Sequence, residues 1–373
     1  MTALFSPLVL GGMELPNRIA VSPMAQYSSA PDGCASDWHL VHLGQLSYSG
    51  AGLVMTEATA VEPDGRGSLQ CLGLYGDSQE QALGRVVDFC RQWGGARLGV
   101  QLSHTGRKGS VRLPWAGRGP LPAEEGGWPV LAPSALAADE GGPVPAELDE
   151  AGLRRVAQAF VSAARRAVRI GFDVIELHAA HGYLLHQFLS PLSNRRDDAY
   201  GGDAARRMRF PLEVAQAVRA VVPSDRALGV RISASDWAEG GFGLEDAVAF
   251  AGTLKSIGCD YVCVSSGGLV GRQQIRVGPE YQVPFAAEVR QRTGLATRAV
   301  GMIALAQQAD AIVRSGRADF VALGRAMLDD PRWGWHAAEA LGAAVDYPKP
   351  YARAASAAWP GARLVRPGGA SAS

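Results

Sequence analysis

The chain has no excess of charge of either sign, because 36 Lys and Arg residues balance 36 Asp and Glu residues among its 373 residues. This balance gives no electrostatic reason to expect a nucleic acid or a membrane surface as a partner. No apolar run approaches the ~20 residues that span a bilayer. The opening MTALFSPLVLGG has neither a basic stretch nor a small-residue cleavage site. We therefore expect a cytoplasmic protein without a signal peptide or membrane segment.

Cysteine is scarce and scattered. The five cysteines are an odd number, at positions 34, 71, 90, 259 and 263, and only the last two are close together. Neither a disulfide framework nor the ligand spacing of a zinc or iron–sulfur site fits this distribution. The pattern indicates reduced thiols, as in a cytoplasmic enzyme.

What the chain does contain is a regular alternation of short apolar and longer amphipathic segments. The predicted strands are Ile19–Ser22, Leu53–Thr56, Leu98–Leu102, Val174–Leu177, Leu228–Ile232, Tyr261–Val264, Arg298–Val300 and Phe320–Leu323. The predicted helices are Asp37–Ser49, Ser78–Trp93, Leu148–Ile170, Ala204–Val221, Leu244–Ile257, Tyr281–Arg292, Ala304–Arg314 and Pro331–Leu341.

This alternation predicts the fold class. Near-continuous hydrophobicity in each strand, followed by a helix, indicates a parallel sheet. Eight such units predict an α/β protein built as a single closed (β/α)8 TIM barrel. An open doubly wound sheet is the alternative, but the Gly-rich dinucleotide turn expected after its first strand is absent.

One region interrupts the alternation. Residues 105–147, after the third predicted strand, are rich in Gly, Pro and Trp, and a long insertion there would lie on the catalytic face of a barrel and could act as a lid. A surface excursion without a role is the alternative. We expect residues 1–353 to form the barrel, with 105–147 as a lid-like loop insertion. Residues 354–373 are rich in Ala, Gly, Ser and Pro and should form a flexible C-terminal tail.

The most informative stretch is an apolar strand that runs into His178, His181 and then Tyr183. The two histidines could be metal ligands together with Glu57 or His104, or satisfied core histidines. They could also be neutral imidazoles that donate N–H bonds to one substrate oxygen, an arrangement that stabilises charge developing on a carbonyl or nitro oxygen. Tyr183 would then be a proton donor, because a phenol stays protonated at neutral pH.

Other polar groups stand at the ends of later strands. The last two predicted strands end in VGM (300–302) and LGR (323–325), where barrels frequently bind phosphate, and Arg325 could add a forked hydrogen bond. Tight-turn glycines with a surface arginine are the alternative, although the SSGG run at 265–268 favours phosphate. Arg231 ends a buried strand and therefore needs a partner, either a structural ion pair or a group that becomes anionic during turnover.

Seven segments carry a resemblance to a known family. They are IAVSPMAQYSS (19–29), VQLSHTGRK (100–108), DVIELHAAHGYLLHQFLSPLSNRRDDAYGG (173–202), VRISASDW (230–237), SSGG (265–268), AVGMI (299–303) and ALGRAML (322–328). Together they resemble the old yellow enzyme family of FMN-dependent ene-reductases. The likeness is greatest to the bacterial branch called thermophilic-like or xenobiotic-reductase-like.

The resemblance implies a non-covalently bound FMN, NADPH as the reductant and no metal. It implies ping-pong reduction of the activated C=C bond of α,β-unsaturated carbonyl or nitro compounds, with His178 and His181 binding the activating oxygen and Tyr183 protonating the α-carbon. The implied cofactor-binding residues are Ser22, Pro23, Met24, Ala25, Ala58, Gln101, Arg231, Gly301, Met302, Gly324 and Arg325. The implied substrate-binding residues are Tyr27, His178, His181, Tyr183 and, from a neighbouring subunit of a homodimer or homotetramer, Arg353.

Two positions depart from the family pattern. The branch usually carries Cys where this chain has Ala25, and losing a hydrogen bond worth ~1 kcal/mol should retune the flavin potential by tens of millivolts. Near the C-terminus, Tyr351 and Arg353 lack the usual tryptophan context. A zinc-dependent barrel hydrolase that uses His178 and His181, and a non-catalytic flavin carrier or sensor, are the alternatives from other classes.

Overall fold

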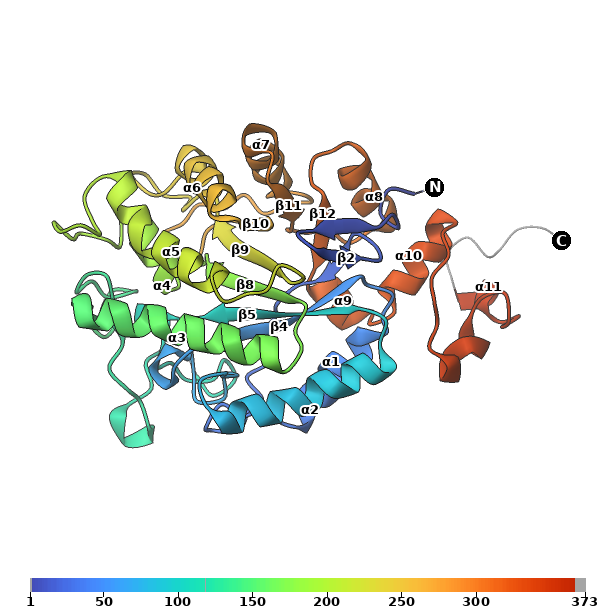
Figure 1. The fold of residues 1–373 in the computed structure, drawn as a ribbon, viewed down its shortest axis with the longest axis horizontal. Coiled ribbons are helices and arrows are strands. Elements are labelled where there is room, and N and C mark those ends of the chain that lie inside the picture. Colours follow the sequence, from blue (N-terminus) through green and yellow to red (C-terminus); the bar gives the residue numbers. More distant parts are fainter. Residues whose placement is uncertain (1, 118, 366–373) are drawn as a thin grey trace.

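The computed structural model describes residues 2–117 and 119–365, whose core is a closed barrel of eight parallel strands (Figure 1). In chain order they are β3 (Ile19–Val21), β4 (Leu53–Ala60), β5 (Arg97–Ser103), β8 (Val174–Ala179), β9 (Ala227–Ser233), β10 (Tyr261–Ser265), β11 (Ala296–Ala299) and β12 (Phe320–Leu323). Each strand pairs with the next, and β12 pairs with β3 to close the barrel. The predicted (β/α)8 TIM barrel is therefore confirmed, and each predicted strand overlaps one of these.

Helices follow the strands and cover the outside of the barrel (Figure 1). The longer ones match the predicted helices: α1 (Asp37–Ser47), α2 (Asp77–Trp93), α3 (Glu150–Arg169), α5 (Ala204–Arg219), α6 (Leu244–Ile257), α7 (Val283–Thr293), α8 (Ala306–Arg314) and α10 (Trp333–Leu341). The helices α4 (Leu184–Leu189) and α9 (Arg325–Asp329) were not predicted, because such short helices are too brief to show a helical period. The described helices include none long and apolar enough to cross a membrane.

Helix α3 shows why these segments become helices. The Asp149 carboxylate accepts a hydrogen bond from the Gly152 N–H and so caps the first turn. Val156, Phe160 and Ala167 are fully buried and recur at helical spacing, so one face of the helix packs on the barrel.

A β-hairpin that the sequence analysis missed closes the amino-terminal end of the barrel. Strands β1 (Leu8–Leu10) and β2 (Met13–Leu15) pair antiparallel across a two-residue Gly turn. Leu10, Met13 and Leu15 are buried in the same apolar cluster as side chains from the barrel interior. This end of the barrel is therefore filled by apolar side chains, which leaves the opposite end for polar chemistry.

The segment between β5 and α3 crosses the carboxyl end of the barrel. It contains the 3-10 turns η2 (Gly106–Lys108) and η3 (Ala123–Glu125) and the paired strands β6 (Leu131–Ala132) and β7 (Ala146–Glu147). The buried Arg107 guanidinium donates to the carbonyls of Leu136 and Ala137 and to that of Leu269, beyond β10. These bonds tie the segment to the loop after β10. Its role as a lid stays a prediction.

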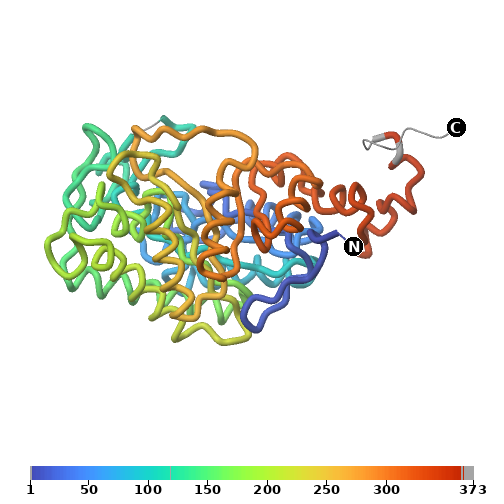
Figure 2. The backbone as a smooth tube through the Cα atoms, turned by 90° about the horizontal axis from the view of Figure 1, so that it is seen from above, coloured from blue at the N-terminus to red at the C-terminus, as the bar shows by residue number. Residues whose placement is uncertain are grey.

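The C-terminal segment lies at the amino-terminal end of the barrel and extends beyond it (Figure 2). It contains η4 (Lys349–Ala354) and α11 (Ala362–Val365). The Tyr351 ring stacks on Tyr48, with ring centres 5.6 Å apart, and Arg332 packs over both rings. The predicted tail at 354–373 therefore begins in described structure, and residues 366–373 lie outside the described chain.

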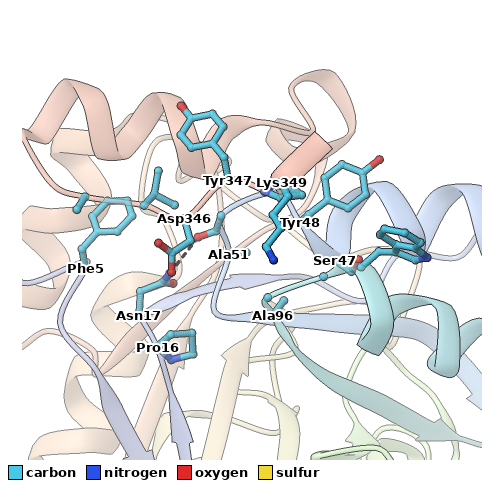
Figure 3. Close-up of a pocket in the computed structure, with 17 residues that line it drawn as sticks. Phe5, Pro16, Asn17, Ser47, Tyr48, Ala51, Ala96, Asp346, Tyr347 and Lys349 are labelled. Atoms are coloured by element: carbon cyan, nitrogen blue, oxygen red, sulfur yellow. Dashed lines mark hydrogen bonds between the residues drawn. The ribbon is translucent and has the colours of Figure 1, made fainter. Parts of the chain in front are cut away.

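A groove of about 430 Å³ lies between this segment and the barrel. Figure 3 shows the residues that line it. Asn17, Ala51 and Ala96, which precede β3, β4 and β5, line one wall, and Asp346 and Lys349 line the other. The groove thus lies at the end of the barrel opposite the histidine-rich strand end.

Candidate active site

A cavity of about 170 Å³ opens at the carboxyl ends of β3, β4 and β5. The lining includes the predicted site residues Ala25, Tyr27, Ala58 and Tyr183. β4 is irregular between Met55 and Ala58, where its pairing with β5 shifts register. Such bulges re-aim side chains next to sites, and this one lies directly before Ala58.

The two predicted histidines converge beside this cavity. His178 is on β8 and His181 follows it, with His178 Nε2 and His181 Nδ1 3.4 Å apart. The rings are nearly perpendicular at 81°, and the Tyr183 ring centre lies 4.6 Å from that of His178. The structure therefore brings together the three residues predicted to be catalytic.

The turn that carries His181 is strained and firmly held. His181 has a φ of 58°, a left-handed conformation that is uncommon for a residue other than Gly and is often found at functional sites. Its N–H donates to Ser233 Oγ at 3.0 Å, and its carbonyl accepts from Lys108 Nζ at 3.0 Å. Lys108 Nζ also donates to the Gly268 carbonyl. A Cβ on Gly182 would lie 2.4 Å from that oxygen, so glycine is required for the close approach.

A buried histidine–aspartate pair that the sequence analysis missed supports the same turn. His186, on α4, accepts the Gly182 N–H at its Nδ1, 2.9 Å away, and its Nε2 lies 3.0 Å from Asp236 Oδ1. Ser190 donates to the other Asp236 oxygen at 2.6 Å. Both side chains of the pair are fully buried. The sequence signal that could have indicated this pair was His186 itself, the third histidine in the segment that carries His178 and His181.

Burial sets the protonation of the three predicted catalytic groups. Removal from water, and then the positive charge of Arg231, lower the pKa values of His178 and His181 well below their usual range. Both imidazoles are therefore neutral at pH 7, as expected for oxygen-binding donors. Burial raises the pKa of the Tyr183 phenol, so Tyr183 keeps its proton.

The zinc interpretation of the two histidines is not supported. Glu57 accepts from the Gln26 N–H at 2.9 Å and pairs with His39 at 3.0 Å. His104 pairs with Glu62 instead. Within the described chain, the only group with metal-ligand spacing is Glu62, Asp64 and His104, which excludes His178 and His181.

That acidic group is also occupied by protein contacts. His104 Nδ1 accepts the Gly106 N–H at 3.0 Å, which leaves the proton on Nε2, facing Glu62. A protonated ring nitrogen cannot bind a metal ion. Arg155 donates to the other Glu62 oxygen at 2.6 Å, so the carboxylate is already paired.

Buried polar groups without a protein partner mark where a cofactor fits. Arg231 is 8% exposed and makes no hydrogen bond or ion pair with the described residues. The structural ion pair considered for it is therefore wrong. The hydroxyls of Ser22 and Ser103 are likewise buried and unpaired. Unpaired buried donors are costly, and the carbonyl and ring-nitrogen acceptors of FMN would satisfy them.

The side chain of Gln101, which was predicted to bind the cofactor, is hydrogen-bonded to a buried carboxylate. Its amide donates to Glu176 Oε1 at 2.8 Å inside the barrel. Glu176 also accepts from the Tyr261 hydroxyl at 2.7 Å and pairs with Arg298 at 2.5 Å. The structure thus places Gln101 in a buried network, and its role toward the cofactor stays a prediction. The Glu176–Arg298 pair was not predicted from the sequence.

The residues predicted for phosphate come together after β11 and β12, which are neighbours in the barrel. Gly301 has a φ of 118° and Met302 a φ of 49°, so both N–H groups belong to a tight turn. Arg325 begins α9, is exposed and makes no hydrogen bond or ion pair with the described chain. A Cβ on Gly324 would lie 3.5 Å from Met24 Sδ, which places the Ser22–Ala25 segment beside this turn.

Arg353 lies away from these groups. It is exposed in η4, at the amino-terminal end of its own barrel. Its predicted role in substrate binding therefore requires a neighbouring subunit and stays a prediction.

Comparison with known proteins identifies the family. The NADH:flavin oxidoreductase / NADH oxidase family matches residues 3–343. NADPH dehydrogenase from Listeria innocua is 45% identical over 355 residues, covering 95% of this chain and 99% of that protein. NADPH dehydrogenase from Geobacillus thermodenitrificans is 44% identical over 353 residues, covering 94% and 98%.

Solved structures agree with the sequence comparisons. Morphinone reductase has a TM-score of 0.76 and 32% identity, covering 94% of this chain and 92% of that one. Its complex with tetrahydroNAD has a TM-score of 0.75 and 31% identity, covering 94% and 93%. The predicted family, FMN and nicotinamide reductant are confirmed. The chain therefore belongs to the NADH:flavin oxidoreductase / NADH oxidase family, as an FMN-dependent oxidoreductase of the old yellow enzyme type.

Proposed function

We propose that this protein uses NADPH to reduce the activated C=C bond of α,β-unsaturated carbonyl or nitro compounds in a ping-pong reaction. The observation that carries the proposal is the convergence of two neutral imidazoles, with His178 Nε2 and His181 Nδ1 3.4 Å apart beside the Tyr183 phenol. The name NADPH dehydrogenase carried by relatives at 44–45% identity supports the reductant.

His178 and His181 would bind the oxygen that activates the alkene. Two neutral N–H donors can share one oxygen acceptor and stabilise the negative charge that develops on it as the C=C bond is reduced. Because burial holds both imidazoles neutral, the pair contributes hydrogen bonds without adding a full positive charge to the cavity.

Tyr183 would protonate the α-carbon. Its raised pKa keeps the proton on the phenol at neutral pH, and its ring packs on His178 at 4.6 Å between centres. One substrate bound by its oxygen would therefore present its α-carbon to the phenol. A positioned general acid contributes roughly 10²–10⁴-fold to the rate.

When bound, FMN supplies the hydride acceptor and donor that link NADPH to the alkene. Arg231 would hold the ring where negative charge accumulates on reduction, because its buried guanidinium has no partner among the described residues. The remaining residues proposed around the ring are Ser22, Pro23, Met24, Ala25, Ala58 and Gln101. Those proposed at the phosphate are Gly301, Met302, Gly324 and Arg325.

Tyr27 and Arg353 would complete the substrate pocket. The Tyr27 ring lines the cavity and packs edge-on against Trp115. Arg353 would come from a neighbouring subunit of a homodimer or homotetramer in the cytoplasm. If Arg353→Ala leaves both turnover and substrate affinity unchanged, the shared pocket is wrong.

An anaerobic absorbance experiment tests the proposed function. We expect the yellow protein to bleach with NADPH and to regain its colour with 2-cyclohexenone. Tyr183→Phe is the matched variant, because it should bleach like wild type and recover roughly 10²–10⁴-fold more slowly. Bleaching without recovery in wild type, across enones and nitroalkenes, would contradict alkene reduction while leaving the flavin chemistry intact.

A further inference from the structure

The two serines of the SSGG run, Ser265 and Ser266, are both hydrogen-bonded to one buried glutamine, Gln282. Ser265 Oγ lies 2.8 Å from His181 Nε2 and 3.2 Å from Gln282 Oε1. Ser266 Oγ lies 2.7 Å from the same Gln282 oxygen. Ser265 and Gln282 are each 3% exposed. The hydroxyls favoured for phosphate in the sequence analysis are thus directed to a glutamine and to the substrate-binding imidazole.

The direction of these hydrogen bonds follows from the donors available. Gln282 Nε2 donates to the Val300 carbonyl at 3.2 Å, so its Oε1 must face the serines as an acceptor. Each serine hydroxyl has one proton to donate. Ser266 donates to Gln282 Oε1 at 2.7 Å. Ser265 Oγ has two acceptors within reach, Gln282 Oε1 at 3.2 Å and His181 Nε2 at 2.8 Å, and we assign its single proton to the shorter contact.

This direction assigns the tautomer of His181. If Nε2 accepts from Ser265, the neutral ring carries its proton on Nδ1. His178 Nδ1 accepts the Ala180 N–H at 3.3 Å, so its proton is on Nε2. The two nitrogens that face each other at 3.4 Å are then both donors and cannot bond to one another. Both are left for an outside acceptor.

We propose that Ser265 is a positioning residue that holds His181 in the Nδ1–H tautomer needed to donate to the substrate oxygen. The identity of that oxygen rests on the proposed function, whereas the tautomer does not. In the other tautomer His181 Nδ1 would present a lone pair to the oxygen, and one of the two donors would be lost.

The chain of bonds also reaches the predicted phosphate turn. Gln282 donates to Val300, directly before Gly301, and a Cβ on Gly301 would lie 2.7 Å from Gln282 Nε2. The same glutamine therefore contacts the end of β11 and Ser265, the serine that orients His181. Gln282 thus connects the predicted cofactor turn, through Val300, with His181, through Ser265.

Nitrogen-15 NMR of histidine-labelled, FMN-loaded protein reads the tautomer directly. We expect wild-type His181 to show a protonated Nδ1 and an unprotonated Nε2, and Ser265→Ala to shift it to Nε2–H or to a mixture. Ser265→Thr keeps the hydroxyl and should restore the Nδ1–H form. Ser266→Ala is the matched control, because Ser266 does not touch His181. A wild-type His181 protonated at Nε2, or one unchanged in Ser265→Ala, overturns the proposal.

Kinetics give a second readout. Loss of one orienting hydrogen bond in Ser265→Ala should lower kcat/KM for 2-cyclohexenone about tenfold, with recovery in Ser265→Thr and little change in Ser266→Ala. Equal losses in Ser265→Ala and Ser266→Ala would contradict a role through His181. If the enzyme reduces no enone or nitroalkene at all, the proposed function fails, and the NMR result still decides the tautomer.

Discussion

The interior of the barrel and its mouth each hold a buried arginine, and the two differ in their partners. Arg298 is fully buried, pairs with Glu176 at 2.5 Å, and lies over the rings of Tyr261 and Phe320. Arg231, at the mouth, is 8% exposed and has no protein partner in the described residues. The charge of Arg298 is therefore neutralised within the folded protein, whereas the charge of Arg231 remains available to a ligand.

Removing the interior charge should have the largest effect. Arg298→Met leaves Glu176 buried without its ion-pair partner, and breaking such a pair costs about 3–5 kcal/mol. Urea unfolding of the purified variant measures this loss. The double variant Arg298→Met with Glu176→Gln is the control and should recover part of the loss. A single variant as stable as wild type would show that the interior pair is not structural.

Removing the charge of Arg231 should leave the stability of the protein unchanged and weaken its binding of FMN. Arg231→Met deletes an unpaired buried cation, so we expect no loss of stability in the FMN-free protein. A hydrogen bond to a charged group contributes about 1.5–3 kcal/mol, so the dissociation constant of FMN should rise roughly 10–100-fold. Flavin fluorescence titration measures it. An unchanged FMN affinity would break the contrast between the two arginines.

The mouth should also respond to acid through its histidines. The pKa values of His178 and His181 are lowered in the folded protein, so the unfolded chain binds more protons below its own histidine pKa of ~6.5. The stability that depends on these histidines being neutral is present above about pH 6.5 and is lost as the pH falls below it. For two histidines that stay neutral, the loss is about 2 kcal/mol between about pH 6.5 and 5.5.

Urea unfolding at the two pH values tests this dependence. The variant His178→Gln with His181→Gln should lose correspondingly less stability over the same interval. An identical pH dependence in wild type and variant would mean that these histidines are not held neutral by the fold.

The smallest expected effect concerns Ala25, which lines the cavity. Ala25→Cys restores a side-chain hydrogen bond of ~1 kcal/mol, which corresponds to roughly 20 mV for a two-electron couple. Anaerobic redox titration measures the midpoint potential. Ala60→Cys places a thiol elsewhere in the cavity lining, at a residue not assigned to the flavin, and serves as the control. Equal potentials in wild type and Ala25→Cys would remove this position from tuning of the flavin.

The strands and long helices could be predicted because their signals are local. Runs such as Val174–Leu177 and faces such as that of α3 carry the period of their own structure. The β1–β2 hairpin, α4 and α9 were missed, because each is too short to show a period. The hairpin is stable only because Leu10, Met13 and Leu15 find the open end of a barrel that forms from distant residues.

For the site, the residue types and their positions along the chain identified the groups that could do the chemistry: two histidines and a tyrosine in one motif, a buried-strand arginine, and glycines after the last two strands. Which of these groups have partners followed from the folded arrangement. Arg231 and Arg298 look alike in sequence, and Ser265 looks like a phosphate ligand. Pairings such as Glu176 with Arg298 and Ser265 with His181 join residues 122 and 84 positions apart. No local pattern encodes such contacts, because barrel closure brings the strand ends together.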